Sequence, residues 1–387
     1  MRKFTKPSIA VTALVALLGL GACTPASESS ERDVDPKIVA EIDAALEEIT
    51  GQVLSKGPNG EDPSPFSVTE MTDEQVAEVA AMGLTAAIVM HYGGNDWANA
   101  QIAGLNAEFE RLGIEVIATT DADFDPARQV SDIETVLAQN PDIIVSIPTD
   151  PVATAGAYRR AVDQGVRLVF MDNVPSGFVP GEDYVSMVSA DNYGNGVTSA
   201  YLLARSLGGE GKIGIIYHEA DFFVTQQRYD GFKKTITEEF PNIEIVQEQG
   251  IAGPDFAGDA QGVANAMLTR HADLEGIWAV WDVPAEGVMA AARETGRTDI
   301  RIATQDLGTN VAMALARNEM IVGLGAQLPY DQGVAEARLA ALSALGVELP
   351  PYVAVSSLPV DHDNVLEAWE LVYRAAPPAS VRDAFVD

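Results

Sequence analysis

The sequence contains one cysteine, Cys23, and four histidines among its 387 residues. A single thiol excludes a disulfide within the chain, and no thiolate metal cluster or cysteine–histidine nucleophile can be built around it. The histidines are scattered without the close spacing of metal ligands, at His91, His218, His271 and His362. We therefore expect a protein that folds around its apolar core and holds neither a metal ion nor a cofactor.

Basic residues are also scarce, since 24 lysines and arginines face 57 aspartates and glutamates and the formal net charge is −33. A surface this acidic repels phosphate backbones, so we expect no nucleic-acid partner.

Catalytic motifs are missing as well. The chain has no Ser-His-Asp order, nucleophile elbow or Walker glycine loop, and we expect that it is not an enzyme. Asp121, Asp123 and Asp125 imitate the spacing of a calcium loop. However, Pro126 stands where that loop needs glycine, and Asp132 stands where it needs a bidentate glutamate. This stretch is therefore predicted to be a solvated turn before a helix.

The first 23 residues have the pattern of a targeting segment. Arg2, Lys3 and Lys6 precede an apolar run, 9–20, that is too short to span a bilayer as a mature helix and that ends in Leu-Gly-Ala-Cys. This segment resembles a bacterial lipoprotein signal, which implies cleavage before Cys23 and attachment of a membrane-anchoring lipid to its thiol.

Residues 24–83 are predicted to form a tether followed by a helical extension. The stretch 24–37 is rich in Ser, Glu, Asp and Pro and cannot bury a core. One short helix is expected over 38–54, and a second opens at Thr72, where Thr-Asp-Glu-Gln has the spacing of a capping box.

From residue 84 onward, short apolar runs alternate with amphipathic stretches. In the stretch 126–138, Val130, Ile133 and Leu137 follow the i, i+3, i+7 spacing of a helix. The other helices of this half are expected over 96–112 and 152–164. The expected strands cover 86–90, 115–118, 143–147 and 167–171, and after Asp191 the rhythm restarts with 212–217, 244–246, 276–280, 301–304 and 321–324.

This alternation predicts an α/β fold of two doubly wound parallel-sheet lobes, each with helices on both faces of its sheet. Ligands bind at the carboxyl ends of such strands, so the predicted site is the cleft between the lobes.

Segments at the predicted strand ends resemble the type I periplasmic sugar-binding proteins of ABC transporters, the ribose- and galactose-binding group. They are Gly94-Asn95-Asp96-Trp97, Ile147-Pro148-Thr149-Asp150, Phe170-Met171-Asp172-Asn173, Ser189-Ala190-Asp191-Asn192, Gln227-Arg228-Tyr229-Asp230-Gly231-Phe232, Val280-Trp281-Asp282, Thr304-Gln305-Asp306 and Ala326-Gln327-Leu328-Pro329. The likeness covers about residues 84–362. It implies the type I periplasmic binding protein fold, with lobes at 84–190 plus 328–351 and at 191–327 plus 352–387, joined by a multi-crossing hinge. The related lactose-repressor-type regulators are disfavoured, because no DNA-reading headpiece precedes the first lobe.

The resemblance assigns the ligand-binding residues position by position: Asn95, Trp97, Asp172, Asn173, Arg228, Phe256, Trp281, Asp306 and Gln327. Carboxylates, amides and a guanidinium suit the hydroxyls of a sugar, while aromatic rings, with Phe222 or Phe223 as further candidates, suit its C–H faces. Asn173 stands where ribose binders have arginine, which puts ribose itself in doubt. Asp191 and Asp282 are expected to brace the hinge and the pocket wall.

The resemblance implies a monomeric lipoprotein of the cell envelope, held at the membrane through Cys23, that captures a sugar or polyol and delivers it to the permease of an ABC transporter. A sugar-sensing receptor that presents its ligand to a chemoreceptor or sensor kinase is the alternative. Hexoses, pentitols and cyclitols remain open as ligands.

Overall fold

The computed structural model describes residues 34–386. The predicted leader, Cys23 and the first part of the tether lie outside these residues. Within the described part of the chain, no helix is long and apolar enough to cross a membrane.

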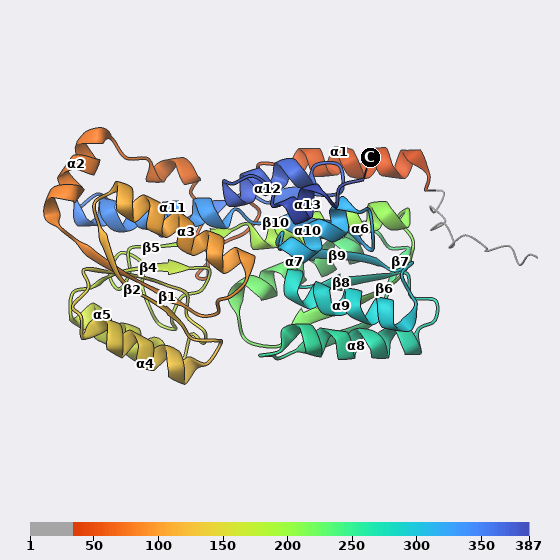
Figure 1. Cartoon of the computed structure of the whole chain (residues 1–387), viewed down its shortest axis with the longest axis horizontal. Helices are drawn as coiled ribbons and strands as arrows, with labels where there is room; N and C mark the ends of the chain where they lie inside the picture. The colour runs from red at the N-terminus through yellow and green to blue at the C-terminus, as the bar shows by residue number, and fades with distance from the viewer. Residues whose placement is uncertain (1–33, 387) are drawn as a thin grey trace, which may run out of the picture. The chain divides into compact units, whose positions relative to one another are not determined.

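The first lobe is a parallel sheet of six strands in the order β11-β5-β4-β3-β1-β2 (Figure 1). Its strands are β1 (Thr85–Met90), β2 (Glu115–Asp121), β3 (Ile143–Ser146), β4 (Arg167–Met171), β5 (Ser186–Ala190) and β11 (Tyr352–Val355). Helices α3 (Asp96–Arg111) and α11 (Pro329–Ala344) cover one face, and α4 (Pro126–Leu137) and α5 (Ala155–Asp163) cover the other.

Side chains along each strand point alternately to the two faces of this sheet and form the core on both of them. In β1, Ile88 belongs to the same buried cluster as Leu105 of α3, whereas the next residue, Val89, belongs to the cluster that contains Ile133 of α4. Successive side chains of a strand point to opposite faces, so a continuous apolar run fits a sheet that is buried on both sides.

The second lobe repeats this plan in the order β12-β10-β9-β8-β6-β7, with only β12 antiparallel. Its strands are β6 (Gly211–His218), β7 (Ile243–Ile251), β8 (Gly276–Ala279), β9 (Arg301–Gln305), β10 (Ile321–Ala326) and β12 (Leu358–Val360). Its helices are α6 (Asn192–Leu207), α7 (Phe223–Glu239), α8 (Phe256–Arg270), α9 (Asp282–Thr295), α10 (Thr309–Ala316), α12 (Val365–Tyr373) and α13 (Ala379–Arg382).

Glycine allows α6 and α7 to pack closely. A Cβ atom on Gly196 of α6 would lie 2.2 Å from the carbonyl oxygen of Arg228 on α7. The backbones therefore approach to a distance that only glycine permits, and this contact fixes the segment of α7 that carries Arg228.

The lobe boundary expected at residue 351 differs from the structure. Residues 352–355 do not enter the second lobe; they form β11, which pairs with β5 in the first sheet. All four side chains of this Tyr-Val-Ala-Val run are buried, so the strand completes the first core before the chain crosses at 356–357.

The N-terminal extension contacts both lobes. Helix α1 (Pro36–Ile49) places Ile42 and Leu46 in the core of the second lobe, while α2 (Asp73–Met82) places Val79 in that of the first. Between them lies a short 3₁₀ helix, η1 (Phe66–Thr69). The predicted capping box of α2 is present, with reciprocal hydrogen bonds between Thr72 and Gln75.

Candidate functional site

A cavity of about 60 Å³ lies between the carboxyl ends of the two sets of strands. Its walls come from the first lobe, the second lobe and the hinge at Gln327. The lining residues are His91, Tyr92, Asn95, Trp97, Phe124, Ile147, Asp172, His218, Phe222, Val224, Thr225, Arg228, Trp281, Asp282, Asp306 and Gln327. Polar and aromatic side chains thus dominate the cavity.

Two carboxylates occupy corresponding places in the lobes. Asp172 directly follows β4, Asp306 directly follows β9, and both have left-handed backbones, with φ of 52° and 65°. Non-glycine residues rarely adopt this conformation, and such strain concentrates at binding sites. The turns that end these two strands therefore aim a carboxylate into the cavity from each lobe.

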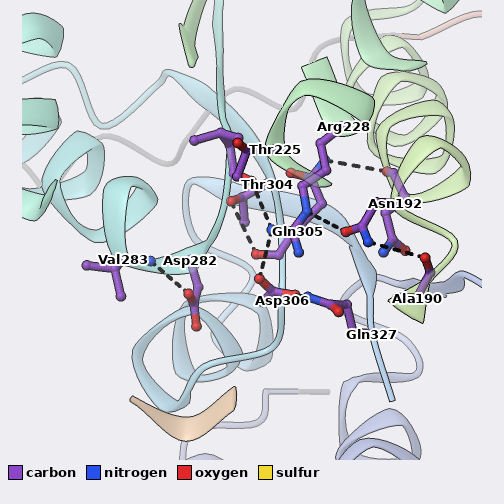
Figure 2. A network of polar contacts seen from close by, with 12 residues as sticks. Ala190, Asn192, Thr225, Arg228, Asp282, Val283, Thr304, Gln305, Asp306 and Gln327 are labelled. Atoms are coloured by element: carbon purple, nitrogen blue, oxygen red, sulfur yellow. Dashed lines mark hydrogen bonds and ion pairs between the residues drawn. The ribbon is translucent and has the colours of Figure 1, made fainter. Parts of the chain in front are cut away.

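Arg228 is the cation at the centre of the polar network in Figure 2. Its Nη1 donates to the Asp306 carboxylate at 3.0 Å and to the carbonyl oxygen of Val280 at 3.3 Å. Its Nε donates to the side-chain oxygen of Asn192 at 2.8 Å, and the Gln327 amide donates to Asp306 at 2.8 Å. Both partners of the Arg228–Asp306 ion pair are buried, so their geometry is set by the fold before any ligand arrives.

Asp172 is less well compensated than Asp306. It accepts a hydrogen bond from the Ser189 hydroxyl at 2.6 Å, and it is almost fully buried. Burial raises the pKa of Asp172 to about 6, against the opposing effects of Ser189 and of the positive charge of Arg228.

The rest of the cavity is an aromatic wall. The His91 ring stacks on Phe222 with centroids 5.4 Å apart, and it meets the Phe124 ring edge-on at 4.7 Å. Trp281 contacts the His218 ring at 5.5 Å. Burial lowers the pKa of His91 to about 3 and the pKa of His218 to about 4, so both imidazoles are neutral at physiological pH.

Several buried polar atoms of the lining have no hydrogen-bond partner within the described residues. They are Nδ1 of His91, Nε1 of Trp97 and Oε1 of Gln327. A buried polar atom without a partner is unfavourable by about 1 to 3 kcal/mol, so these atoms are ready to bond a polar ligand.

The structure brings most of the predicted site residues together. Those that line the cavity are Asn95, Trp97, Asp172, Arg228, Trp281, Asp306 and Gln327. Asn95 also caps α3, since its side-chain oxygen accepts from the backbone N–H of Ala98 at 2.8 Å.

Two predicted residues are not in the lining. The Asn173 amide donates to the carbonyl oxygen of Pro148 at 3.0 Å. Phe256 packs behind Trp281, with ring centroids 4.9 Å apart. Each therefore supports the wall instead of facing the cavity.

Two further aspartates have the surroundings expected of bracing residues. Asp191 caps α6 and accepts three hydrogen bonds from the extension, from the backbone N–H of Leu54, the backbone N–H of Ser55 and the Ser55 hydroxyl. Asp282 lies in the cavity wall and accepts from the backbone N–H of Val283 at 2.9 Å.

Sequence reasoning missed His91, Tyr92, Phe124 and His218. One signal could have found the histidines: His91 directly follows β1 and His218 ends β6, and these are corresponding strands of the two lobes. Residues at the carboxyl ends of parallel strands face the site, whatever their type.

The profile of the periplasmic binding protein domain matches residues 86–346. A ribose import binding protein of Bacillus subtilis is 27% identical over 227 residues, which are 58% of this chain and 70% of the relative. A D-apiose import binding protein of Paraburkholderia graminis is 25% identical over 237 residues, 60% of this chain and 73% of the relative. Among solved structures, an ABC transporter solute-binding protein from Agrobacterium vitis with bound allitol is 26% identical, with a TM-score of 0.67 over 74% of this chain and 98% of that one.

Proposed function

Because the chain belongs to the periplasmic binding protein domain family, we propose that it captures a sugar or polyol outside the cytoplasm and delivers it to the permease of an ABC transporter. The observation that carries this proposal is the cluster of Asp172, Arg228, Asp306 and Gln327 inside an otherwise aromatic cavity. Hydroxyls donate to the carboxylates and accept from the guanidinium and amide, while the rings cover apolar C–H faces.

The size of the cavity limits the ligand. The cavity has a volume of only about 60 Å³, and side chains from both lobes line it. Such a space supports a compact ligand of monosaccharide size or smaller, and it disfavours an oligosaccharide.

Import is the role that the relatives support. The two curated relatives are named import binding proteins, for ribose and D-apiose, and the neighbour from Agrobacterium vitis holds allitol. We further propose that the protein binds its ligand without chemistry, as expected of a periplasmic binding protein domain. Incubation with each bound sugar, followed by mass spectrometry, should recover the sugar unchanged.

A thermal-shift screen over sugars and polyols tests the binding function. A ligand at 100 times its dissociation constant stabilises the protein by about 2.7 kcal/mol, which for a chain of this length raises the unfolding midpoint by roughly 4 °C. If no sugar or polyol shifts the midpoint while compounds of another class do, the proposed function is wrong.

We also propose that lipid on Cys23 holds the protein at the membrane, with residues 24–33 as part of the tether. Cys23→Ser should move the protein from the membrane fraction to the soluble fraction and leave its ligand affinity unchanged. Retention of fully processed Cys23→Ser protein in the membrane fraction would contradict the anchor.

A further inference from the structure

The cavity carries more negative than positive groups. Asp172, Asp282 and Asp306 line it, and Arg228 is the only lysine or arginine in the lining. Each of these four residues is at most 7% exposed, so water screens their charges weakly. The site therefore has an excess of carboxyl groups in a poorly solvated place.

Arg228 forms an ion pair with only one of the three carboxylates. It pairs with Asp306, whereas among residues 34–386 neither Asp172 nor Asp282 has an ion-pair partner. Asp172 accepts a hydrogen bond from the Ser189 hydroxyl. Asp282 accepts one from the backbone N–H of Val283, as Figure 2 shows. Neutral donors satisfy lone pairs but do not cancel a buried charge.

The surroundings add negative charge. Burial and the charges of Asp306, Glu286 and Asp96 raise the pKa of Asp282. The groups that act on Asp172 are Ser189, Arg228 and Asp306, and the buried Glu336 and Tyr352 also lie within its electrostatic reach. Asn173 is uncharged and its amide donates to the Pro148 carbonyl, so it adds no positive charge to the site.

Two solutions exist for such a site: the carboxyls hold protons, or the ligand brings a cation. A metal ion is a poor candidate, because the described residues include no group of three or more acidic, histidine or cysteine side chains arranged to hold one. An organic ammonium fits better. The rings of Tyr92, Phe124 and Trp281 lie in the same cavity, and aromatic faces attract organic cations at about 0.5 to 2 kcal/mol each.

We propose that the ligand is a compact polyhydroxylated amine, an amino sugar, amino alditol or aminocyclitol, whose ammonium group lies against Asp282 and the neighbouring aromatic rings of the cavity. Its hydroxyls then bond Arg228, Gln327 and Asn95. This assignment rests on the proposed function, because it names the substrate class of the same cavity.

Calorimetry on matched pairs tests this assignment. The probes are D-glucosamine with D-glucose, D-glucamine with D-glucitol, and an inosamine with the inositol of the same ring configuration; N-acetyl-D-glucosamine keeps the nitrogen but not its charge. In the pair that fits the cavity, we expect the amine to bind at least tenfold more tightly than its neutral partner. Asp282→Asn should reduce this preference below threefold, whereas Glu238→Gln, an exposed carboxyl on α7, should keep it.

The outcomes separate the two proposals. Binding of neutral sugars or polyols as tightly as the amines, with no change of preference in Asp282→Asn, would overturn the amine assignment and leave the sugar-binding function standing. Failure of every sugar, polyol and amine to bind would overturn both. Circular dichroism of the variants confirms that they are folded, and the wild-type pairs decide the matter even if Asp282→Asn does not fold.

Discussion

At the scale of single residues, the site depends on charges that the fold buries before the ligand arrives. Arg228 and Asp306 form a buried ion pair, whereas Asp172 has no ion-pair partner among the described residues and has a raised pKa. The lone pairs and protons that remain free in this arrangement are the ones that a hydroxyl or an ammonium can use. Binding strength and protein stability are therefore linked at these positions.

Arg228→Ala should abolish measurable capture. The substitution removes the donors and leaves Asp306 as a buried carboxylate without its ion pair, a loss of about 2 to 4 kcal/mol, or roughly 30- to 1000-fold in affinity. Calorimetry should show this loss, and Lys234→Ala, an exposed position on the same helix, should bind like the wild type. Binding of Arg228→Ala within threefold of wild type would mean that the site lies elsewhere.

Asp172→Asn should stabilise the ligand-free protein at neutral pH. The folded-state pKa of Asp172, about 6, is above the ordinary value of 3.8, so the folded protein holds a proton that the unfolded chain has lost. The raised pKa of Asp172 therefore contributes to the stability of the folded protein at low pH. This contribution is lost as the pH rises from about 4 to 6, and the loss is at most about 3 kcal/mol. Asparagine removes the charge and tolerates a positive φ.

The measurement for Asp172→Asn is urea unfolding at pH 5 and pH 7.5. The difference in unfolding free energy between variant and wild type should be larger at pH 7.5, while ligand affinity falls. An equal difference at both pH values would show that Asp172 does not titrate in this range.

At the scale of elements, helix packing positions the binding groups. Arg228 reaches the cavity because α7 lies tightly on α6 at Gly196, where no side chain separates the backbones. The turns that end β4 and β9 likewise position Asp172 and Asp306 at the cavity.

Gly196→Ala should disturb both stability and binding. Its Cβ would lie 2.2 Å from the Arg228 carbonyl oxygen, so the helices must separate, which destabilises by about 1 to 3 kcal/mol and shifts the guanidinium. Gly262→Ala is the matched control, because it lies in helix α8 with nothing within 4 Å of its Cβ, and it should stabilise slightly. Thermal unfolding with calorimetry measures both effects, and unchanged affinity in Gly196→Ala would show that α6 does not position Arg228.

The sequence predicted the helices and strands whose residue pattern is contained within one short segment. Apolar runs such as 143–147 marked buried strands, and Thr72 with Gln75 marked the start of α2. It did not predict β5 or β11 as strands, because Ser186–Ala190 is half polar and Tyr352–Val355 follows two prolines. β11 also pairs with β5, which lies far back along the chain, and such a pairing leaves no local signal.

The residues of the site likewise fall into those that the sequence could predict and those that it could not. Asp172, Arg228 and Asp306 stand in ordered segments that a family resemblance can place. His218 joins His91 and Phe124 only when the two lobes meet, so neither periodicity nor spacing could indicate the complete aromatic wall.

At the scale of the whole described molecule, the lobes are joined by hinge segments and also by a direct contact. Asp96 of α3 accepts hydrogen bonds from the backbone N–H of Thr309, at 2.6 Å, and from its hydroxyl, at 2.7 Å. Thr309 opens α10, so a carboxylate of the first lobe lies at a helix N-terminus of the second, where negative charge is favourable. This contact joins the two lobes directly without lining the cavity.

Asp96→Ala should therefore weaken capture by about 1 to 2 kcal/mol, roughly 5- to 30-fold, although it removes no group from the cavity wall. Small-angle scattering should show that ligand compacts the wild type, and that Asp96→Ala needs more ligand for the same change. Asp163→Ala, an exposed carboxylate of the first lobe, serves as the control. Equal ligand dependence in Asp96→Ala and wild type would show that the contact does not favour closure.

The pairing of Ser64 with β11 has a consequence for the behaviour of the protein at high concentration. The backbone N–H of Ser64 donates to Tyr352 at 3.0 Å, and its carbonyl accepts from Ala354 at 3.1 Å, so the extension covers the outer edge of the first sheet. An uncovered edge strand of buried apolar residues is a template on which other chains add strands and aggregate. At high protein concentration, the segment around Ser64 thus hinders self-association, and a shortened chain that starts at the first strand would lose this protection while keeping its binding cavity.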